Sequence, residues 1–324
     1  MQYRPFGKTG WKVSEVGLGT WQIGGHWGPT NDTESLQTLL CAFEKGINYV
    51  DTAFGYGNGH SEEIIGQALK CWKGSKIYVA TKAPPVRWPS PEDDHPLMRG
   101  RYPEWYLREQ VEASLGRLGV ECLDLFQLHC WIEEGVECLD WLETLNKLKL
   151  EGKIDRIGVS LRDYRPEEGI TLANLGLVDS QQVIFNIFEQ RPIDHLFRVG
   201  ELTGTTFIAR VPYDSGSLVG EWTHATYQEW GKEDIRQRFF RGERFHETLD
   251  RIRLLKETCS PFFSSLAEAA LRYSLSDSAV SVVIPGMKNR AEVEMNTRYS
   301  DGKKFPAELA AALEPHRWAR NYYA

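Results

Sequence analysis

The stretch 47–56, INYVDTAFGY, is the most informative about the fold, because a short apolar run ends at Asp51 and Tyr56 follows on the next turn. Two later runs end in a similar way, since KIYVATK ends at Lys82 and LDLFQLH ends at His129. Short, nearly continuous apolar runs are typical of parallel strands that are buried on both faces. The carboxyl ends of parallel barrel strands meet at one rim, so we expect these four side chains to converge there.

Similar strand-like runs alternate with helix-like runs along the rest of the chain. This alternation predicts an α/β fold with parallel strands joined by right-handed crossovers. Eight such repeats predict a (β/α)8 TIM barrel, with an N-terminal β-hairpin at 3–16 and an extra C-terminal helix at 305–324. The expected strands lie at 16–20, 47–51, 76–82, 123–129, 154–160, 181–186, 205–210 and 279–285.

Helices are predicted from apolar residues that recur at helical spacing. The first helix follows Asn31, and Glu34 stands three residues later in the pattern of a capping box. In the fourth helix, the leucines at 139, 142, 145 and 148 are expected to face the core. Two connections, 83–102 and 211–262, are too long to be simple turns; both follow strands, so both are expected on the catalytic rim.

Composition and charge exclude several classes of protein. The 324 residues suit one α/β barrel, and because composition does not shift along the chain, 1–324 is predicted to be a single domain. The net charge of −7 is spread without a basic block, so no nucleic-acid partner is expected. The six cysteines form no C-x-x-C pair, which favours reduced thiols and predicts no metal site.

The ends of the chain and its apolar runs predict where the protein works. The N-terminus has no apolar signal core, and no run approaches the ~18 apolar residues of a membrane span. A cytoplasmic protein with no membrane partner is therefore expected. No pattern in the sequence predicts the oligomeric state.

Asp51, Tyr56, Lys82 and His129 form a group suited to polarising a carbonyl. If Lys82 lies beside Tyr56, its ammonium is expected to lower the pKa of the phenol from about 10, while Asp51 holds the lysine charged. His129 is expected to orient the carbonyl and to share in proton donation. None of the four delivers a hydride, so a nicotinamide cofactor is required.

There are two alternatives to this interpretation, a structural ion pair and a dinucleotide-binding fingerprint. Asp51 and Lys82 would also pair if their role were structural, because a lysine is too costly to bury alone. The neighbouring Tyr56 makes that alternative weaker. The glycines of GYGNGH resemble the G-x-G-x-x-G fingerprint of dinucleotide-binding folds, but His60 stands where the third glycine of that fingerprint belongs.

Several motifs together resemble one known family. They are FGKTGWKVSEVGLGTW at 6–21, DTAFGYGNGHSEE at 51–63, Lys82, DLFQLH at 124–129 and IPG at 284–286. Over essentially the whole chain, they are similar to the aldo-keto reductases, in the bacterial, NAD(P)H-dependent form. The resemblance implies a hydride transfer between NAD(P)H and a carbonyl or alcohol group of a small aldehyde, ketone or sugar. It implies Tyr56 as general acid, tuned by Lys82 and Asp51, and His129 as the residue that orients the substrate.

The same resemblance implies a set of cofactor-binding residues. They are Gly19, Thr20, Trp21, Asp51, Ser160, Gln182, Arg210, Ser217, Leu218, Gly220, Gly286, Lys288, Arg290 and Asn296. Ser160 and Gln182 are expected to hold the carboxamide, and Lys288 and Arg290 to pair with a 2′-phosphate. These two cations make NADPH the expected cofactor. NADH is the alternative, because Glu292 stands where many NADP-specific members carry arginine and would repel a phosphate if it pointed inward.

The substrate is expected to meet aromatic walls at the mouth of the site. Trp21, Phe54, Trp88 and Trp131 are the candidates, with core packing as the alternative role for the tryptophans. The alternative function is a nucleotide-sensing regulatory subunit like the channel-associated relatives of these enzymes, in which turnover is incidental. The intact group of four residues argues against that function.

Overall fold

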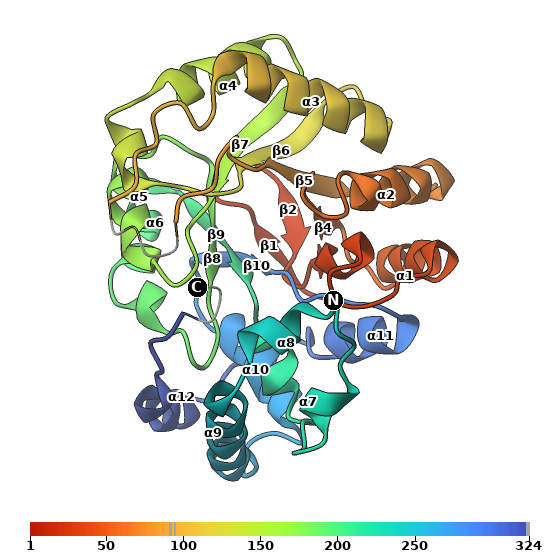
Figure 1. Cartoon of the computed structure of the whole chain (residues 1–324), viewed down its shortest axis with the longest axis vertical. Helices are drawn as coiled ribbons and strands as arrows, with labels where there is room; N and C mark the ends of the chain where they lie inside the picture. The colour runs from red at the N-terminus through yellow and green to blue at the C-terminus, as the bar shows by residue number, and fades with distance from the viewer. Residues whose placement is uncertain (91–92, 94, 322–324) are drawn as a thin grey trace.

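The computed structural model describes residues 1–90, 93 and 95–321. Its centre is a sheet of eight parallel strands whose spatial order follows the chain (Figure 1). The strands are β3 (Leu18–Gly19), β4 (Tyr49–Asp51), β5 (Tyr78–Ala83), β6 (Leu123–Leu128), β7 (Ile154–Ser160), β8 (Ser180–Ile184), β9 (Thr206–Arg210) and β10 (Val280–Val283). Each of the eight overlaps a strand that the sequence predicts.

Main-chain hydrogen bonds between the two ends of the sheet close it into a barrel. Val16, just before β3, forms a parallel bridge with Val283 of β10. The Gly17 amide donates to the Val283 carbonyl at 2.8 Å, and the Val283 amide donates to the Glu15 carbonyl at 2.8 Å. The predicted TIM barrel is therefore confirmed.

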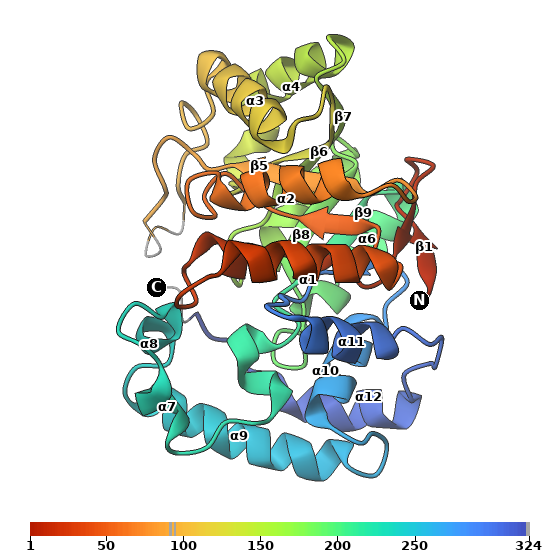
Figure 2. The same ribbon diagram turned by 90° about the vertical axis from the view of Figure 1, so that its right-hand side faces the viewer.

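Helices cover the outside of the barrel (Figures 1 and 2). Those that follow strands are α1 (Asp32–Glu44), α2 (His60–Cys71), α3 (Glu104–Leu118), α4 (Asp140–Leu150), α5 (Ile170–Leu175), α6 (Leu196–Thr203), α10 (Leu266–Ser274) and α11 (Arg290–Arg298). The predicted N-cap forms, since the Asn31 side chain accepts from the Glu34 amide at 3.1 Å. Leu139 was expected to face the core, but it precedes α4 as its N-cap and is 37% exposed.

The C-terminal helix is shorter than predicted. It is α12 (Ala307–Leu313), and a single 3-10 turn (Glu314–His316) follows it. Pro315 explains the early end, because proline has no amide to donate to the carbonyl four residues earlier. Beyond this turn, the Trp318 amide donates to the Phe188 carbonyl at 2.9 Å, so the tail crosses back towards the barrel. The prediction for 322–324 lies outside the described residues.

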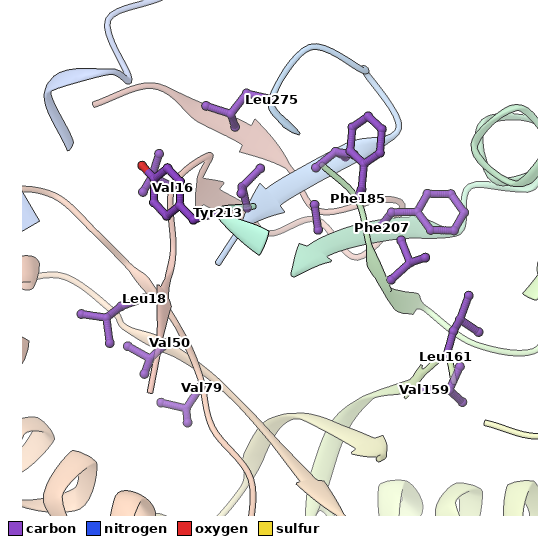
Figure 3. Packing of buried hydrophobic residues seen from close by; sticks show 14 of the residues in the cluster. Val16, Leu18, Val50, Val79, Val159, Leu161, Phe185, Phe207, Tyr213 and Leu275 are labelled. Atoms are coloured by element: carbon purple, nitrogen blue, oxygen red, sulfur yellow. The ribbon is translucent and has the colours of Figure 1, made fainter. Parts of the chain in front are cut away.

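Alternation along the strands divides the apolar core into two layers. Leu18, Val50 and Val79, from three neighbouring strands, belong to the large cluster between the barrel and its helices (Figure 3). Tyr49 and Ala80, which are their sequence neighbours, belong to a second cluster inside the barrel. Successive side chains on a strand point to opposite faces, which explains why neighbours in sequence enter different layers.

The predicted N-terminal hairpin consists of β1 (Tyr3–Pro5) and β2 (Lys12–Ser14), which pair antiparallel. Just after β1, Phe6 stacks on Trp11 at 5.5 Å and on Tyr49 at 5.6 Å between ring centroids. Trp11 in turn stacks on Tyr78 at 4.6 Å. Because Tyr49 and Tyr78 are the first residues of their strands, these rings close the amino-terminal end of the barrel, opposite the rim.

The connection from β9 to α10 contains helices that the sequence analysis did not predict. They are α7 (Thr226–Glu229), α8 (Ile235–Phe239) and α9 (Glu243–Cys259), preceded by a 3-10 segment (Asp214–Val219). Figure 2 shows all three helices gathered at one end of the molecule. A buried aromatic cluster, Trp230, Phe239, Phe240 and Phe245, holds them together. Among the described residues, no helix combines the length and apolar character needed to cross a membrane.

Candidate active site

Asp51 and Lys82 form a buried ion pair at the carboxyl ends of β4 and β5. The Lys82 ammonium donates to Asp51 Oδ2 and to the Thr52 carbonyl, both at 2.7 Å. The two side chains are only 2% and 0% exposed. Strand register brings them together, because Asp51 lies opposite Ala80 and Lys82 is the next residue on the same face of β5. Removing either partner would leave an uncompensated buried charge, so each fixes the other in place.

Two glutamine amides approach the other oxygen of Asp51. Gln182 Nε2 donates to Asp51 Oδ1 at 2.7 Å, and Gln127 Nε2 lies at 3.4 Å, which is a long hydrogen bond. Gln182 was expected to hold a carboxamide, and its amide nitrogen is instead directed at Asp51. Its Oε1 accepts no hydrogen bond from the described residues, so that atom remains available. Gln127 was not predicted as a site residue.

Tyr56 stands on the turn between β4 and α2, where the backbone takes an unusual shape. Gly57, Asn58 and Gly59 have φ values of 68°, 53° and 96°, a region that glycine enters without a Cβ clash. Gly24 lies against the same turn, because a Cβ atom there would be 2.6 Å from the Tyr56 carbonyl carbon. The glycines around Tyr56 therefore build the turn that holds it.

The side chain of Tyr56 meets the other expected catalytic residues. Its ring centroid lies 5.9 Å from that of His129, and the Lys82 ammonium lies 5.1 Å from the Tyr56 centroid. The ring also stacks on Trp21 at 6.2 Å. With Asp51 hydrogen-bonded to Lys82, the structure brings all four predicted side chains together.

The ionisation of Tyr56 differs from the expectation. Burial, followed by the charge of Asp51, raises the pKa of Tyr56 well above its usual value, although Arg210 lowers it. Lys82 was expected to lower this pKa, but its charge is paired with Asp51 and it lies over the ring. The phenol is therefore neutral at neutral pH, and it retains a proton for transfer.

His129, directly after β6, is also neutral. Burial, together with the charges of Lys82 and Arg210, holds the pKa of His129 well below its usual range. Its Nδ1 atom has no hydrogen-bond partner in the described part of the chain. A neutral imidazole offers one N–H donor and one acceptor, which suits it to holding a carbonyl oxygen.

A cavity of about 1370 Å³ opens at this rim and includes Tyr56 and His129 in its lining. The expected cofactor residues that line it are Gly19, Thr20, Trp21, Asp51, Ser160, Gln182, Arg210, Gly286, Lys288 and Asn296. The expected substrate residues Trp21, Phe54 and Trp88 line it as well. Its volume exceeds the roughly 1,000 Å³ of a large small-molecule pocket, so it has room for a dinucleotide beside a substrate.

Trp131 does not line the cavity, although it was expected at the mouth. Its side chain is fully buried, and Nε1 donates to the Glu168 carbonyl at 2.9 Å. The ring packs edge-on against Trp141, with centroids 5.5 Å apart. Trp131 follows the rim residue His129 by two positions, but it packs into the core behind the rim, so the geometry gives it no contact with a substrate.

Four expected cofactor residues also lie outside the cavity lining: Ser217, Leu218, Gly220 and Arg290. Leu218 is fully buried, and the Ser217 hydroxyl donates to Asp214 at 2.6 Å. Gly220 ends the 3-10 segment in a left-handed conformation. Arg290 is the first residue of α11 and is exposed. The geometry therefore supports Lys288, but not Arg290, as a cation facing a ligand.

Arg210, at the end of β9, places a positive charge beside the catalytic group. Its Nη2 atom donates to Asp163 Oδ1 at 2.6 Å and to the Leu161 carbonyl at 3.1 Å. Asp163 was not predicted as a site residue, yet it lines the cavity and anchors this arginine. An arginine thus occupies the position where the resemblance leads one to expect an aromatic ring.

Other lining residues come from the connection between β9 and α10, and sequence reasoning missed them. Tyr213, Trp222, Arg236 and Arg238 all border the cavity. The length of the 211–262 connection placed it on the catalytic rim, and the arginine and aromatic residues of 221–245 are a further signal, but neither identifies the individual residues that line the cavity. No helical period marks the connection, because its helices are short and pack against one another.

The residues at the two ends of the cavity fit a dinucleotide. At the catalytic end, Ser160 and Gln182 line the cavity, and Ser160 Oγ and Gln182 Oε1 have no hydrogen-bond partner among the described residues, which suits a carboxamide. Towards the start of α11, Lys288 and Arg236 supply cations that suit a phosphate.

Comparison with known proteins agrees with this geometry. The model of the Aldo/keto reductase family matches residues 15–317. The aldo-keto reductase YhdN of Bacillus subtilis (strain 168) is 30% identical over 299 residues, which cover 91% of this chain and 87% of that protein. The NADH-specific methylglyoxal reductase of Escherichia coli (strain K12) is 30% identical over 339 residues, covering 97% and 100%. The holo form of aldo-keto reductase AKR11C1 from Bacillus halodurans superposes with a TM-score of 0.76 at 25% identity, covering 99% of this chain and 97% of the other.

The barrel and its rim define an oxidoreductase of the NAD(P)H-dependent class, whose typical substrates are small carbonyl compounds. The chain belongs to the aldo/keto reductase family. The resemblance noted in the sequence is thereby confirmed over the full length of the protein.

Proposed function

We propose that this protein reduces the carbonyl group of a small aldehyde, ketone or sugar with NAD(P)H, and that it oxidises the corresponding alcohol in reverse. The observation that carries the proposal is the group at the rim: a buried Lys82–Asp51 pair beside a neutral Tyr56 and a neutral His129. The bound dinucleotide supplies the hydride. The chain supplies the proton and the polar surroundings of the reacting oxygen.

In this proposal, Tyr56 donates its hydroxyl proton to the carbonyl oxygen as negative charge develops there. An N–H of His129 holds the same oxygen. The Lys82 ammonium, 5.1 Å from the Tyr56 ring centroid, stabilises the phenolate that remains after transfer. Asp51 keeps Lys82 charged, and the two glutamine amides keep Asp51 in place.

We further propose that NADPH is the preferred cofactor and NADH the alternative. Lys288 favours NADPH because its ammonium lines the cavity. Glu292 was expected to repel a phosphate if it pointed inward; the residue does line the cavity, and its carboxylate accepts from the Lys288 amide at 2.7 Å at the start of α11. A carboxylate held by the helix start has less freedom to oppose a phosphate. Ser160 and Gln182 are the proposed contacts of the carboxamide.

Aromatic side chains support a substrate with a flat or ring-shaped face. Trp88 is 55% exposed, and its ring centroid lies 5.6 Å from that of His129. Trp21 and Phe54 line the same part of the cavity. Such rings favour aromatic carbonyls or the apolar face of a sugar. In this proposal the whole chain, 1–324, works as one barrel domain.

The test is the consumption of reduced cofactor by the purified full-length protein. NADPH and NADH are each mixed with a panel of aldehydes, ketones and ketosugars, and the loss of dinucleotide absorbance is followed. The proposal predicts oxidation that depends on both protein and carbonyl, fastest with NADPH. Tight dinucleotide binding without oxidation for any member of the panel would favour the nucleotide-sensing subunit instead.

A further inference from the structure

The motif DTAFGYGNGHSEE at 51–63 contains polar residues to which the proposed reaction gives no role. Ser61 and Glu62 lie on the first turn of α2, directly after the turn that carries Tyr56. Both side chains are 0% exposed. Burying a polar side chain costs free energy unless it is hydrogen-bonded. The partners of Ser61 and Glu62 therefore indicate what these two residues do.

Ser61 is at the centre of a buried network of hydrogen bonds. Its amide donates to the Tyr56 carbonyl at 3.2 Å. Its hydroxyl accepts from the Thr52 hydroxyl at 2.9 Å and donates to the Thr20 hydroxyl at 2.8 Å. Thr20 in turn donates to the Asp51 carbonyl at 2.9 Å. Ser61 therefore ties the main chain of Tyr56 to the residues that directly follow β3 and β4.

Thr52 is also the residue whose carbonyl holds Lys82. The Lys82 ammonium donates to that carbonyl at 2.7 Å. The Phe54 amide donates to the Lys82 carbonyl at 3.1 Å, so the segment between β4 and Tyr56 is bonded to Lys82 twice. A displacement of Thr52 would move the ammonium, and a displacement of the turn would move the phenol. Because Ser61 is bonded to both Thr52 and Tyr56, it couples the positions of the two groups.

Glu62 holds the strand that carries Lys82. Its carboxylate accepts from the hydroxyl of Thr81, which directly precedes Lys82 on β5. The other carboxylate oxygen accepts from Arg117 Nε of α3 at 2.6 Å. Because successive residues of a strand point to opposite faces, Thr81 reaches the helix layer while Lys82 enters the barrel. Glu62 therefore fixes β5 against α2 one residue away from Lys82.

Arg117 extends this contact to the turn that carries Tyr56. Its guanidinium carbon lies 5.1 Å from the ring centroid of Phe54, which lines the cavity. A Cβ atom on Gly59 would lie 2.5 Å from Arg117 Nε, so the turn packs directly on this side chain. The side chains of Arg117 and Glu62 are only 18% and 0% exposed, so solvent ions screen their attraction little. The ion pair therefore supports the Tyr56 turn as well as β5.

We propose that Ser61 and Glu62 are positioning residues, which hold the Tyr56 phenol and the Lys82 ammonium in the arrangement that proton transfer needs. The inference rests on the proposed function, because it assigns a role within the same reaction. Neither Ser61 nor Glu62 lines the cavity, so neither contacts the substrate or the dinucleotide. Displacing a reacting group by about 1 Å can slow a chemical step ~10²-fold. These two residues therefore act on the rate of the chemical step and not on binding.

Kinetics and binding, measured separately on the full-length protein, test this assignment. Ser61→Ala removes the hydroxyl, and Glu62→Leu removes both carboxylate oxygens. Each should lower the kcat of carbonyl reduction about 10- to 100-fold, while the KM for the carbonyl and the Kd for NADPH change little. Glu62→Gln keeps an oxygen that can accept from Thr81, so it should recover part of the rate lost in Glu62→Leu. Rates are expressed per NADPH-binding site, so that an unfolded fraction does not count as a loss of kcat.

Thr248→Ala and Glu63→Gln are the matched controls. Thr248 also carries a fully buried hydroxyl, which donates to the Arg244 carbonyl on α9 at 2.7 Å. Glu63 is the exposed neighbour of Glu62 on α2. Both controls should keep the kcat of the wild type, even where Thr248→Ala lowers the melting temperature.

Several outcomes would overturn the inference. An unchanged kcat in Ser61→Ala and Glu62→Leu would leave both residues with a structural role only, and if Glu62→Leu does not fold, Ser61→Ala decides alone. A raised KM with an unchanged kcat would mean that the two residues shape the binding site instead. An equal fall in kcat for Thr248→Ala would show that the loss of any buried hydroxyl slows this protein. A wild type that reduces no carbonyl would end the proposed function itself, whereas wild-type turnover matched by every variant would end this inference alone.

Discussion

The two ends of the barrel interior are built from the same strands, yet their chemistry is opposite. Further from the rim, Tyr49 and Ala80 belong to a buried apolar cluster that also contains Phe6, just after the first strand of the hairpin. Two residues further along the same strands stand Asp51 and Lys82, which are equally buried but charged. An apolar layer lowers the free energy of the fold, whereas a buried ion pair contributes little net stability. The difference indicates that the charged end serves chemistry and that the apolar end holds the fold.

The largest effect on stability and activity is expected from Lys82→Met, which removes the positive charge of the buried ion pair. Asp51 would lose its counter-ion, so the free energy of unfolding should fall by about 3–5 kcal/mol. Carbonyl reduction should fall by about 10²–10⁴-fold, because the phenolate of Tyr56 would lose its stabilising charge. Chemical denaturation and steady-state kinetics measure the two losses. Full activity in the folded variant would remove Lys82 from the mechanism.

A double variant, Asp51→Leu with Lys82→Met, tests whether the ion pair serves catalysis or holds the fold together. Replacing both charges by apolar groups removes the desolvation cost of the pair. We expect its stability to equal or exceed that of the wild type while activity stays absent, as shown by denaturation and by the carbonyl assay. A double variant as unstable as Lys82→Met would show that the pair holds the fold together.

Phe6→Ala removes a buried ring from the apolar cluster inside the barrel. The ring is fully buried between Trp11 and Tyr49, so its loss should cost about 3–5 kcal/mol of stability. The turnover of the folded protein should stay close to that of the wild type, because the cavity lies at the other end of the barrel. A large fall in kcat at a temperature where the variant is folded would contradict the separation of the two ends.

The smallest effect is expected from pH, through His129. Its pKa lies well below 6.5 in the folded protein, whereas an unfolded chain takes up the proton near 6.5. Below pH 6.5 the unfolded state binds more protons than the folded state. The stability that a neutral His129 contributes is therefore present above pH 6.5 and is lost as the pH falls. His129→Gln lacks the titrating group, and its stability should decline less than that of the wild type between pH 7 and pH 5. Parallel declines in thermal denaturation would show that His129 is not held neutral.

The sequence predicted the strands and their ends well, because buried parallel strands leave a simple signal. Asp51, Lys82 and His129 each end or follow an apolar run, so their meeting at one rim follows from the barrel alone. The ionisation of Tyr56 could not be predicted in the same way. The direction of its pKa shift depends on burial and on where Lys82 points, and neither is visible in the order of residues.

Other features depend on contacts that no local pattern records. Trp131 follows a rim strand, but its indole finds a carbonyl partner in the core. Arg236 lies on a five-residue helix without a usable period, and only tertiary packing brings it to Trp27 and Lys288. The N-cap at Asn31 was predictable because its partner, the Glu34 amide, lies within one turn.

Tyr56→Phe, compared with Tyr49→Phe, tests the central claim most directly. Each variant removes one phenol hydroxyl, Tyr49 from β4 and Tyr56 from the turn that follows it; the buried hydroxyl of Tyr49 has no hydrogen-bond partner among the described residues. With NADPH saturating, we predict that Tyr56→Phe lowers the single-turnover rate of carbonyl reduction by about 10²–10⁴-fold, while Tyr49→Phe leaves it unchanged. Equal rates for the two variants would contradict the assignment of Tyr56 as the proton donor.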